Sequence, residues 1–141
     1  MTSFLLDTNV VSEAIRERPN PAVMAWLKQN GARAFIPSIV VAELQLGIEL
    51  MPQGRRRQDL ETWFLGLVQG SFADRILAFD AEAALAFGRI VAGARRSGRP
   101  TPVADAQIAA VALVHGLSVA TRDVADFAGF GVALVNPFEG G

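Results

Sequence analysis

The sequence predicts an α/β fold: a three-layer α/β/α sandwich with a mostly parallel central sheet and helices on both faces. Short apolar runs of strand length alternate with longer amphipathic segments from one end of the chain to the other. Strands that alternate with helices in this way form βαβ units, whose strands are parallel. The 141 residues contain neither an internal repeat nor a long linker, so one domain over residues 1–141 is expected.

Each element has its own local signal. Short apolar runs closed by turn residues predict strands at 4–6, 34–36, 75–79, 117–120 and a possible edge strand at 132–135. Helical periodicity predicts helices at about 10–16, from 21 onward, 39–50, 55–68, 81–96 and 102–116. The expected N-caps of four of these helices are Asn9, Ser38, Asp80 and Thr101.

The composition excludes several kinds of chemistry. Cysteine is absent and His115 is the single histidine, which excludes a disulfide framework, a cysteine zinc site and a thiol nucleophile. The apolar run at the N-terminus is too short for a signal peptide, and no run approaches the roughly 18 residues of a membrane span. A cytoplasmic protein with no membrane association is therefore expected, and any catalysis must use carboxylates, hydroxyls and arginines.

Acidic side chains follow two of the predicted strands. Asp7 comes directly after the first strand, while Asp123 and Asp126 come shortly after the fourth. Ligands of open α/β sheets collect at the carboxyl ends of the strands. A turn residue or a dipole-matched acid is the alternative interpretation of Asp7, and one of the later pair, more readily Asp126, could cap a short turn.

Two more acids lie on apolar helix faces. Glu43 shares one stripe with Ile39, Leu46 and Leu50, and we expect its carboxylate to be buried there. A buried carboxylate needs a cation or strong donors, so the alternative is a buried ion pair with an arginine. Asp105 begins an Ala- and Val-rich helix, where a dipole-matched acid in the first turn is the alternative interpretation.

Together these acids predict a metal site. Carboxylates that converge at one sheet edge repel one another unless a cation neutralises them. Oxygen donors without histidine or cysteine favour Mg²⁺, with Mn²⁺ as the other candidate. Such a site can hydrolyse phosphodiesters without a side-chain nucleophile.

Four segments resemble the PIN-domain family, and within it the FitB-like branch of VapC toxins from toxin–antitoxin modules. They are Leu5-Leu6-Asp7-Thr8-Asn9, Ala42-Glu43-Leu44, residues 102–110 (PVADAQIAA) and residues 120–127 (ATRDVADF). Each motif is weak alone, whereas four in family-like order and spacing are specific. The resemblance implies a Mg²⁺-dependent ribonuclease restrained by a cognate antitoxin protein.

The resemblance also assigns the site. Asp7, Glu43 and Asp105 match the first three acids of the family and would be catalytic metal ligands. Asp123 matches the fourth position, which is often asparagine in this branch, so it either ligates metal or orients water. The residues expected to support these four are Thr8, Asn9, Thr121 and Asp126, with Asp126 also the alternative fourth acid.

Arginine clusters give candidate RNA contacts, because the guanidinium fork suits phosphate. The candidates are Arg95, Arg96, Arg99 and Arg122. With 51% apolar residues the chain is expected to hide surface in a homodimer and against the antitoxin. Two other functions stay open at this point: a catalytically silent protein-binding module and a small-molecule metal phosphohydrolase.

Overall fold

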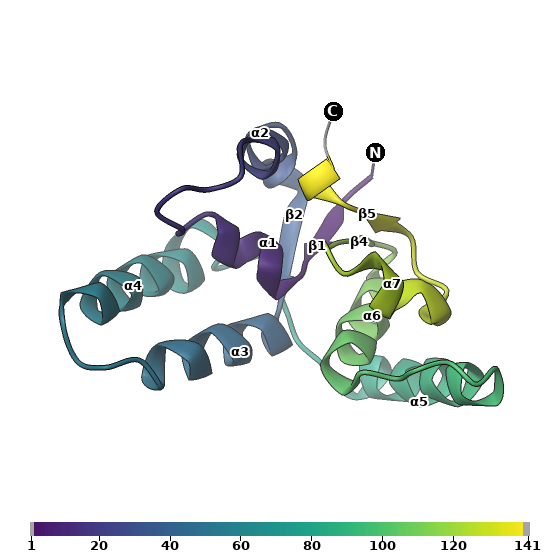
Figure 1. Cartoon of the computed structure of the whole chain (residues 1–141). Coiled ribbons are helices and arrows are strands. Elements are labelled where there is room, and N and C mark those ends of the chain that lie inside the picture. Colours follow the sequence, from purple (N-terminus) through teal and green to yellow (C-terminus); the bar gives the residue numbers. More distant parts are fainter. Residues whose placement is uncertain (1, 140–141) are drawn as a thin grey trace.

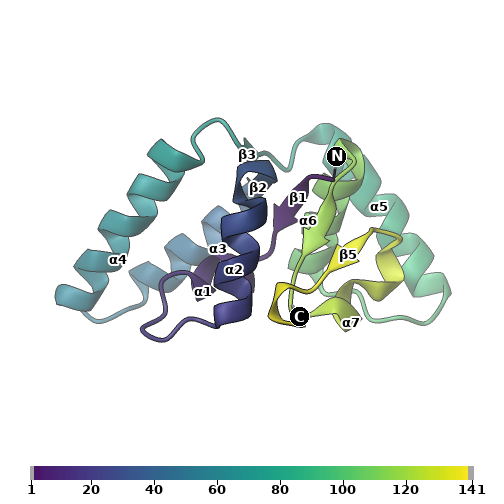
Figure 2. The same cartoon turned by 90° about the horizontal axis from the view of Figure 1, so that it is seen from above.

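A computed structural model describes residues 2–139 and confirms the predicted fold. Five parallel strands form the sheet in the order β3-β2-β1-β4-β5. Figure 1 labels β2, β1, β4 and β5, and Figure 2 labels β3. Their bounds are Phe4–Leu6 for β1, Ala34–Pro37 for β2, Ile76–Leu77 for β3, Ser118–Ala120 for β4 and Leu134–Val135 for β5.

Helices cover both faces of the sheet. Their bounds are Thr8–Glu13 for α1, Pro21–Asn30 for α2, Ser38–Glu49 for α3, Arg55–Gly66 for α4, Ala81–Arg96 for α5, Val103–His115 for α6 and Val124–Phe127 for α7. The chain leaves β1 toward β2 and β3, then crosses back to β4 and β5. Because parallel crossovers are right-handed, this reversal places α1, α3 and α4 on one side of the sheet and α5, α6 and α7 on the other (Figures 1 and 2).

The core is centred on β1 and α6. Leu5 of β1 and Ile108 of α6 are completely buried, and so is Phe127 of α7. Val23 of α2 and Val40 of α3 close the core from the other side of the sheet. Because β1 lies between β2 and β4, Asp7, the residue that follows β1, lies at the middle of the sheet and not at its edge.

Several element ends differ from the predictions. Asp7 caps α1, so the expected cap Asn9 lies inside its first turn. Thr101 is not the cap of α6 either, because Pro102 takes that position and the helix begins at Val103. Ser38 is the first residue of α3 and its hydroxyl accepts the Phe79 N–H at 3.1 Å. Asp80 caps α5 through the Ala83 N–H, as predicted.

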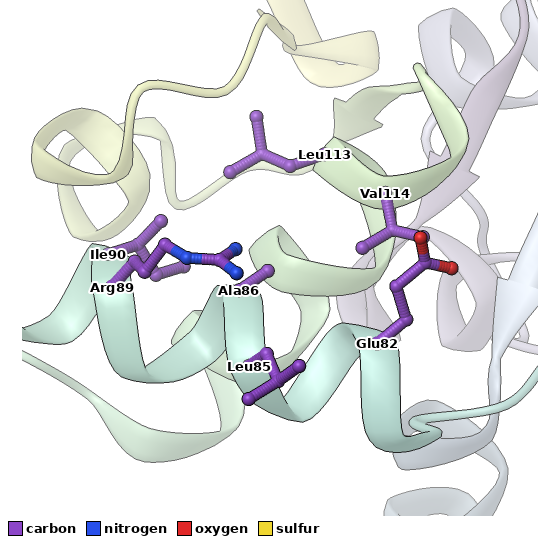
Figure 3. A pocket seen from close by; sticks show the side chains of 7 residues that line it. All are labelled: Glu82, Leu85, Ala86, Arg89, Ile90, Leu113 and Val114. Carbon is purple, nitrogen blue, oxygen red and sulfur yellow. The ribbon is translucent and has the colours of Figure 1, made fainter.

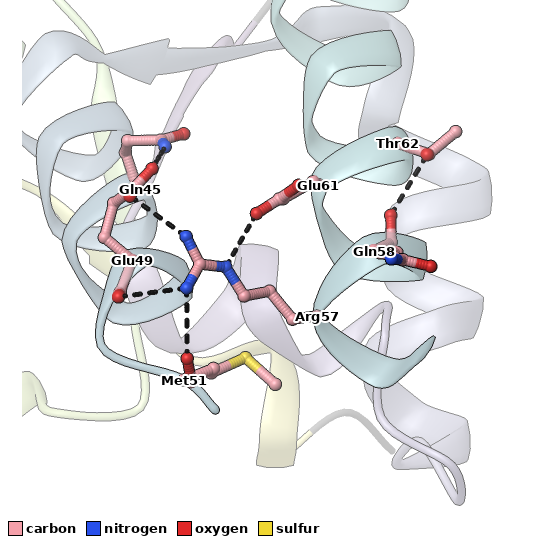
Figure 4. A network of polar contacts seen from close by, with 7 residues as sticks. All are labelled: Gln45, Glu49, Met51, Arg57, Gln58, Glu61 and Thr62. Atoms are coloured by element: carbon pink, nitrogen blue, oxygen red, sulfur yellow. Dashed lines mark hydrogen bonds and ion pairs between the residues drawn. The ribbon is translucent and has the colours of Figure 1, made fainter. Parts of the chain in front are cut away.

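Arg57 fixes α4 against the end of α3. Its guanidinium contacts the carboxylates of Glu61 at 2.7 Å and Glu49 at 3.1 Å, and donates to the Met51 carbonyl at 3.2 Å (Figure 4). These charged partners raise the pKa of Arg57, and the hydrogen bond that Arg57 donates to Glu61 is the largest cause. The predicted helix 55–68 ends at Gly66, and a π-turn over Leu67–Ser71 continues it.

Gly116 ends α6 in the left-handed conformation, with φ of 67°. We expect Gly116→Ala to lower the free energy of unfolding by about 1 kcal/mol, because an L side chain is strained there. Gly93 on the exposed surface of α5 is the matched control, since a Cβ there meets no atom within 4 Å. Gly93→Ala should stabilise by about 0.5 kcal/mol. Urea unfolding of both variants checks the pair, and equal signs would contradict the prediction.

Candidate metal and nucleic-acid site

Asp7 is the centre of the candidate site. It follows β1, and its backbone N–H continues the sheet by donating to the Ala120 carbonyl at 3.0 Å. Its side chain is only 4% exposed relative to a free residue, and its Oδ1 accepts the Thr8 N–H at 2.8 Å as the cap of α1. Burial is the largest cause that raises the pKa of Asp7, although hydrogen bonds from Thr121 and Thr8 oppose it.

Thr121, the residue after β4, joins Asp7 to the following loop. Its buried hydroxyl donates to Asp7 Oδ2 at 2.7 Å and accepts the Asp123 N–H at 2.9 Å. The hydroxyl therefore donates one hydrogen bond and accepts another, and it links the two acidic residues. The structure therefore brings together the ends of two strands that are far apart in the sequence, as the strand pattern predicted.

Asn9 links the same groups from the opposite side. Its side-chain amide donates to Asp7 Oδ2 at 3.2 Å and to Asp123 Oδ2 at 3.0 Å, while its Oδ1 accepts the Arg122 N–H at 3.1 Å. The side-chain amide of Asn9 on α1 therefore donates hydrogen bonds to the carboxylates of both Asp7 and Asp123.

Glu43 reaches the site from α3, but it is not buried. Its Oε1 accepts the Thr8 hydroxyl at 2.8 Å. The expectation of an enclosed apolar face was wrong: Leu46 and Leu50 on that stripe are 60% and 76% exposed. The helix instead buries Val40 and Ile48, and it packs against β2 and against the helices α1, α4 and α6. Among residues 2–139, no ion pair involves Glu43, so the alternative of a buried arginine pair was wrong as well.

Asp105 faces this group from the first turn of α6. Burial and, to a smaller extent, the carboxylates of Asp7, Asp126, Asp123 and Glu43, in that order, together raise its pKa to about 6. Each of the other four acids is therefore close enough to Asp105 to repel its ionised form. Asp123 is the N-cap residue of α7 and Asp126 lies in its first turn; neither side chain caps the helix. The suggestion that Asp126 is the turn's cap was thus wrong.

The donor chemistry fits a divalent cation. Every acid in the group offers carboxylate oxygen, and within the described part of the chain none of the five forms an ion pair with lysine or arginine. The repulsion is therefore uncompensated by protein charges. In residues 2–139 the side chains as they stand form no group of three acids close enough to hold one cation, so binding requires them to draw together.

The arginines expected to contact RNA differ in their surroundings. Arg122 is exposed, and its guanidinium lies 4.9 Å from the centre of the Phe138 ring, a contact that sequence spacing did not reveal. Arg95 and Arg96 are exposed at the end of α5. The Arg99 side chain covers Gly129, where an added Cβ would lie 2.6 Å from Arg99 Cδ.

An apolar hollow adjoins the acids. Thr8 and Glu43 lie at its border with the site, and its other walls come from α1, α3, α4 and the turn after α3. The apolar side chains in these walls are Ile15, Leu44, Ile48, Met51, Leu60 and Trp63. Trp63 is half-buried: its side chain packs against the core and also borders this opening.

The PIN-domain family model matches residues 4–130, which include all five acids. The chain belongs to the PIN-domain family. This confirms the resemblance found in the motifs, and the parallel sheet that presents the acids is the fold of its structural relatives. The single domain over residues 1–141 stays a prediction, since the match ends before the C-terminus.

Two relatives within the PIN-domain family have informative names. VapC ribonuclease Y4jK of Sinorhizobium fredii is 40% identical over 137 residues, which cover 96% of this chain and 98% of the relative. Toxin FitB of Neisseria gonorrhoeae is 40% identical over 137 residues, with coverage of 96% and 99%. Similarity to the VapC and FitB toxins therefore extends over nearly the full length of both chains.

A solved structure shows the same similarity in three dimensions. The structure of FitAB bound to an IR36 DNA fragment superposes with a TM-score of 0.91 at 38% identity, over 96% of each chain. DNA-bound VapBC from Salmonella typhimurium gives 0.78 at 29% identity, over 97% of this chain and 99% of the other.

Proposed function

We propose that this chain is a metal-dependent endoribonuclease that acts as the toxin of a toxin–antitoxin pair. The observation that carries the proposal is a group of five carboxylates near the carboxyl ends of β1 and β4, none of which forms an ion pair with lysine or arginine within residues 2–139. Full-length similarity to a VapC ribonuclease and to toxin FitB supports the same activity. Mg²⁺ is the expected cation, with Mn²⁺ as a substitute.

Asp7 and Asp105 are the first choice as metal ligands, with Glu43 and Asp123 completing the set. A bound Mg²⁺ supplies Lewis acidity toward phosphate oxygens and lowers the pKa of water. Thr121 and Asn9 orient the Asp7 carboxylate through hydrogen bonds at 2.7 and 3.2 Å. Thr8 orients Glu43 in the same way. Asp126 lies on the rim as the alternative fourth acid.

RNA phosphates would be held by arginines around the acids. We assign this role to Arg95, Arg96, Arg99 and Arg122, all of which are exposed. The stem of Arg99 is already ordered against Gly129, and the guanidinium of Arg122 against Phe138. Less side-chain entropy would then be lost when a phosphate binds.

The proposed partners are a cognate antitoxin and a second copy of the chain. The two structural relatives described above are toxin–antitoxin complexes, and both are bound to DNA. The exposed Leu46 and Leu50, beside the hollow that adjoins Glu43, offer an apolar surface for the antitoxin. No helix within residues 2–139 has the length and apolar character to cross a membrane. We place the action on RNA in the cytoplasm.

Metal removal tests this proposal. The purified chain, freed of antitoxin, is incubated with total RNA and with a small phosphomonoester, in Mg²⁺ or in EDTA. We expect RNA fragments in Mg²⁺, none in EDTA, and recovery when Mn²⁺ is added. Hydrolysis of the small ester alone would indicate a phosphohydrolase. Intact RNA together with no Mg²⁺ binding by calorimetry would indicate a silent binding module and contradict the proposal.

A further inference from the structure

Three arginines of the chain lie over aromatic rings, and Arg122 differs from the other two. The guanidinium groups of Arg33 and Arg75 also donate hydrogen bonds to main-chain carbonyls. The Arg122 guanidinium lies 4.9 Å from the centre of the Phe138 ring, and within residues 2–139 only its backbone N–H donates a hydrogen bond. The described part of the chain therefore leaves the guanidinium donors of Arg122 unused.

Acids surround the start of this side chain, yet the guanidinium pairs with none of them. The backbone N–H of Arg122 donates to Asn9 Oδ1 at 3.1 Å, and the Asn9 amide donates to the carboxylates of Asp7 and Asp123. A guanidinium close to carboxylates is attracted to them. Within residues 2–139, however, Arg122 forms no ion pair. Another contact must therefore hold its guanidinium away from the acids.

Phe138 supplies this contact from the other end of the sequence. It lies in the single helical turn Pro137–Glu139, which packs against α2. The Asn136 side chain accepts the Phe138 N–H at 2.9 Å, which fixes the backbone of this turn. The ring packs against the core and is half-buried, whereas Arg122 is exposed. The ring is thus an anchored surface, and a cation is attracted to its face.

Arg89 of α5 is an exposed arginine without such a ring. It borders the hollow between α5 and α6, and Figure 3 shows that the other side chains there are aliphatic apart from Glu82. Within the described residues Arg89 lies over no aromatic ring and forms no ion pair. The stacked position of Arg122 is therefore specific to its place beside the acids.

We infer that Phe138 is a positioning residue of the acidic site. Its ring draws the Arg122 guanidinium away from Asp7 and Asp123, so their carboxylates stay available to a cation. The fork of the guanidinium stays available to an RNA phosphate next to the cation. The inference rests on the proposed nuclease function, and it adds to the site a residue that none of the acidic motifs contains. Without the ring, the guanidinium would pair with a carboxylate and neither group could bind its ligand.

Removal of the ring tests this inference, with calorimetric titration of Mn²⁺ as the readout. In Phe138→Leu the guanidinium is free to pair with the carboxylates, so the affinity for Mn²⁺ should fall about 10-fold. The double variant, which also carries Arg122→Gln, has no cation to release and should recover at least the wild-type affinity. A ring that mattered only for packing would leave the double variant as weak as Phe138→Leu. Phe138→Trp keeps an aromatic face and should resemble the wild type.

RNA affinity should follow a different order in the same variants. Fluorescence anisotropy of a labelled single-stranded RNA is measured in EDTA, where no metal-dependent cleavage consumes the probe. Arg122→Gln and Phe138→Leu should each weaken binding about 3- to 10-fold, because each removes the same phosphate contact. The double variant should bind no more weakly than Arg122→Gln alone. A further loss in the double variant would show that the ring contacts RNA directly and would overturn the inference.

Phe72→Leu is the matched control, because it removes the ring under Arg75. Hydrogen bonds to two main-chain carbonyls still hold that guanidinium, so neither affinity should change. Circular dichroism must show that each variant is folded. Wild-type Mn²⁺ affinity in Phe138→Leu, or no recovery in the double variant, would overturn the inference and leave the nuclease proposal standing. The expected affinities in a chain that leaves RNA intact in Mg²⁺ would support the inference and contradict the nuclease proposal alone.

Discussion

Asp7→Asn and Asp105→Asn are each expected to slow RNA cleavage in Mg²⁺ by about 100-fold or more. Both carboxylates are proposed metal ligands, and a loss of several kcal/mol of electrostatic stabilisation corresponds to two or three powers of ten in rate. Initial rates of cleavage of a fluorogenic RNA measure the effect. Asp74→Asn is the control, because Asp74 is an exposed acid outside the group. Cleavage at the wild-type rate by either site variant would refute our assignment.

Asp105→Asn should at the same time stabilise the metal-free protein. Burial and four neighbouring carboxylates raise the pKa of Asp105 to about 6 in the folded chain, from the ordinary 3.8. The folded state therefore binds this proton more tightly than the unfolded state, and the ionised form opposes folding at pH 7. Allowing for screening at this partly exposed group, removal of the charge should add about 1 kcal/mol, or about 4 °C in Tm.

The sign of this effect gives it a distinctive pH dependence. Between pH 4 and 6, Asp105 is protonated in a larger fraction of folded molecules than of unfolded ones. Its contribution to the stability of the wild type should therefore fall as pH rises through this window. The advantage of Asp105→Asn should be complete above about pH 6 and vanish toward pH 4. Thermal melts in EDTA at several pH values measure the difference. A constant difference across the range would show that the charge is not its cause.

Thr121→Val is expected to lower both stability and metal affinity, although it changes none of the proposed metal ligands. Valine keeps the shape but removes the donor to Asp7 Oδ2 and the acceptor of the Asp123 N–H. Thr121 is completely buried, so both groups lose a partner where water does not replace it. We expect a loss of about 2 kcal/mol in unfolding free energy, and a loss of about 10- to 100-fold in metal affinity.

Thr121→Ser is the control for this prediction, because it restores the hydroxyl while removing only a methyl group. Calorimetric titration with Mn²⁺ and chemical unfolding should show Thr121→Ser close to the wild type and Thr121→Val well below it. If both variants lose metal affinity equally, packing of the methyl group is the important property of Thr121.

Sequence patterns predicted the centre of the fold well. Phe4-Leu5-Leu6 is apolar throughout because β1 is covered on both faces, and Asp7 is polar because the strand ends there. The short outer strands were harder: β3 contains only Ile76 and Leu77, since one side of this strand has no partner. A pattern of apolar residues does not reveal where hydrogen bonding to a neighbour stops.

The site was predictable in its residues but not in its surroundings. Asp7, Asp105, Asp123 and Glu43 were predicted from their positions after strands and on helices. In the structure Asp7, Asp123 and Glu43 lie near enough to Asp105 to raise its pKa. Burial of Glu43 was mispredicted because the apolar residues of its stripe, Leu46 and Leu50, are themselves exposed. The link from Asn9 to Asp123 spans 114 residues, and local spacing carries no information about such a contact.

The strand order has a consequence for the moment at which the protein can first act. Asp7 is synthesised at the start, but Thr121, which holds it, follows 114 residues later. A domain generally folds as a unit during synthesis, once its segments have emerged from the ribosome. Because β1 gains its second neighbour only when β4 appears, a partly translated chain has no complete acidic site. A nuclease built this way stays harmless to its own ribosome and messenger until translation of the domain is almost finished.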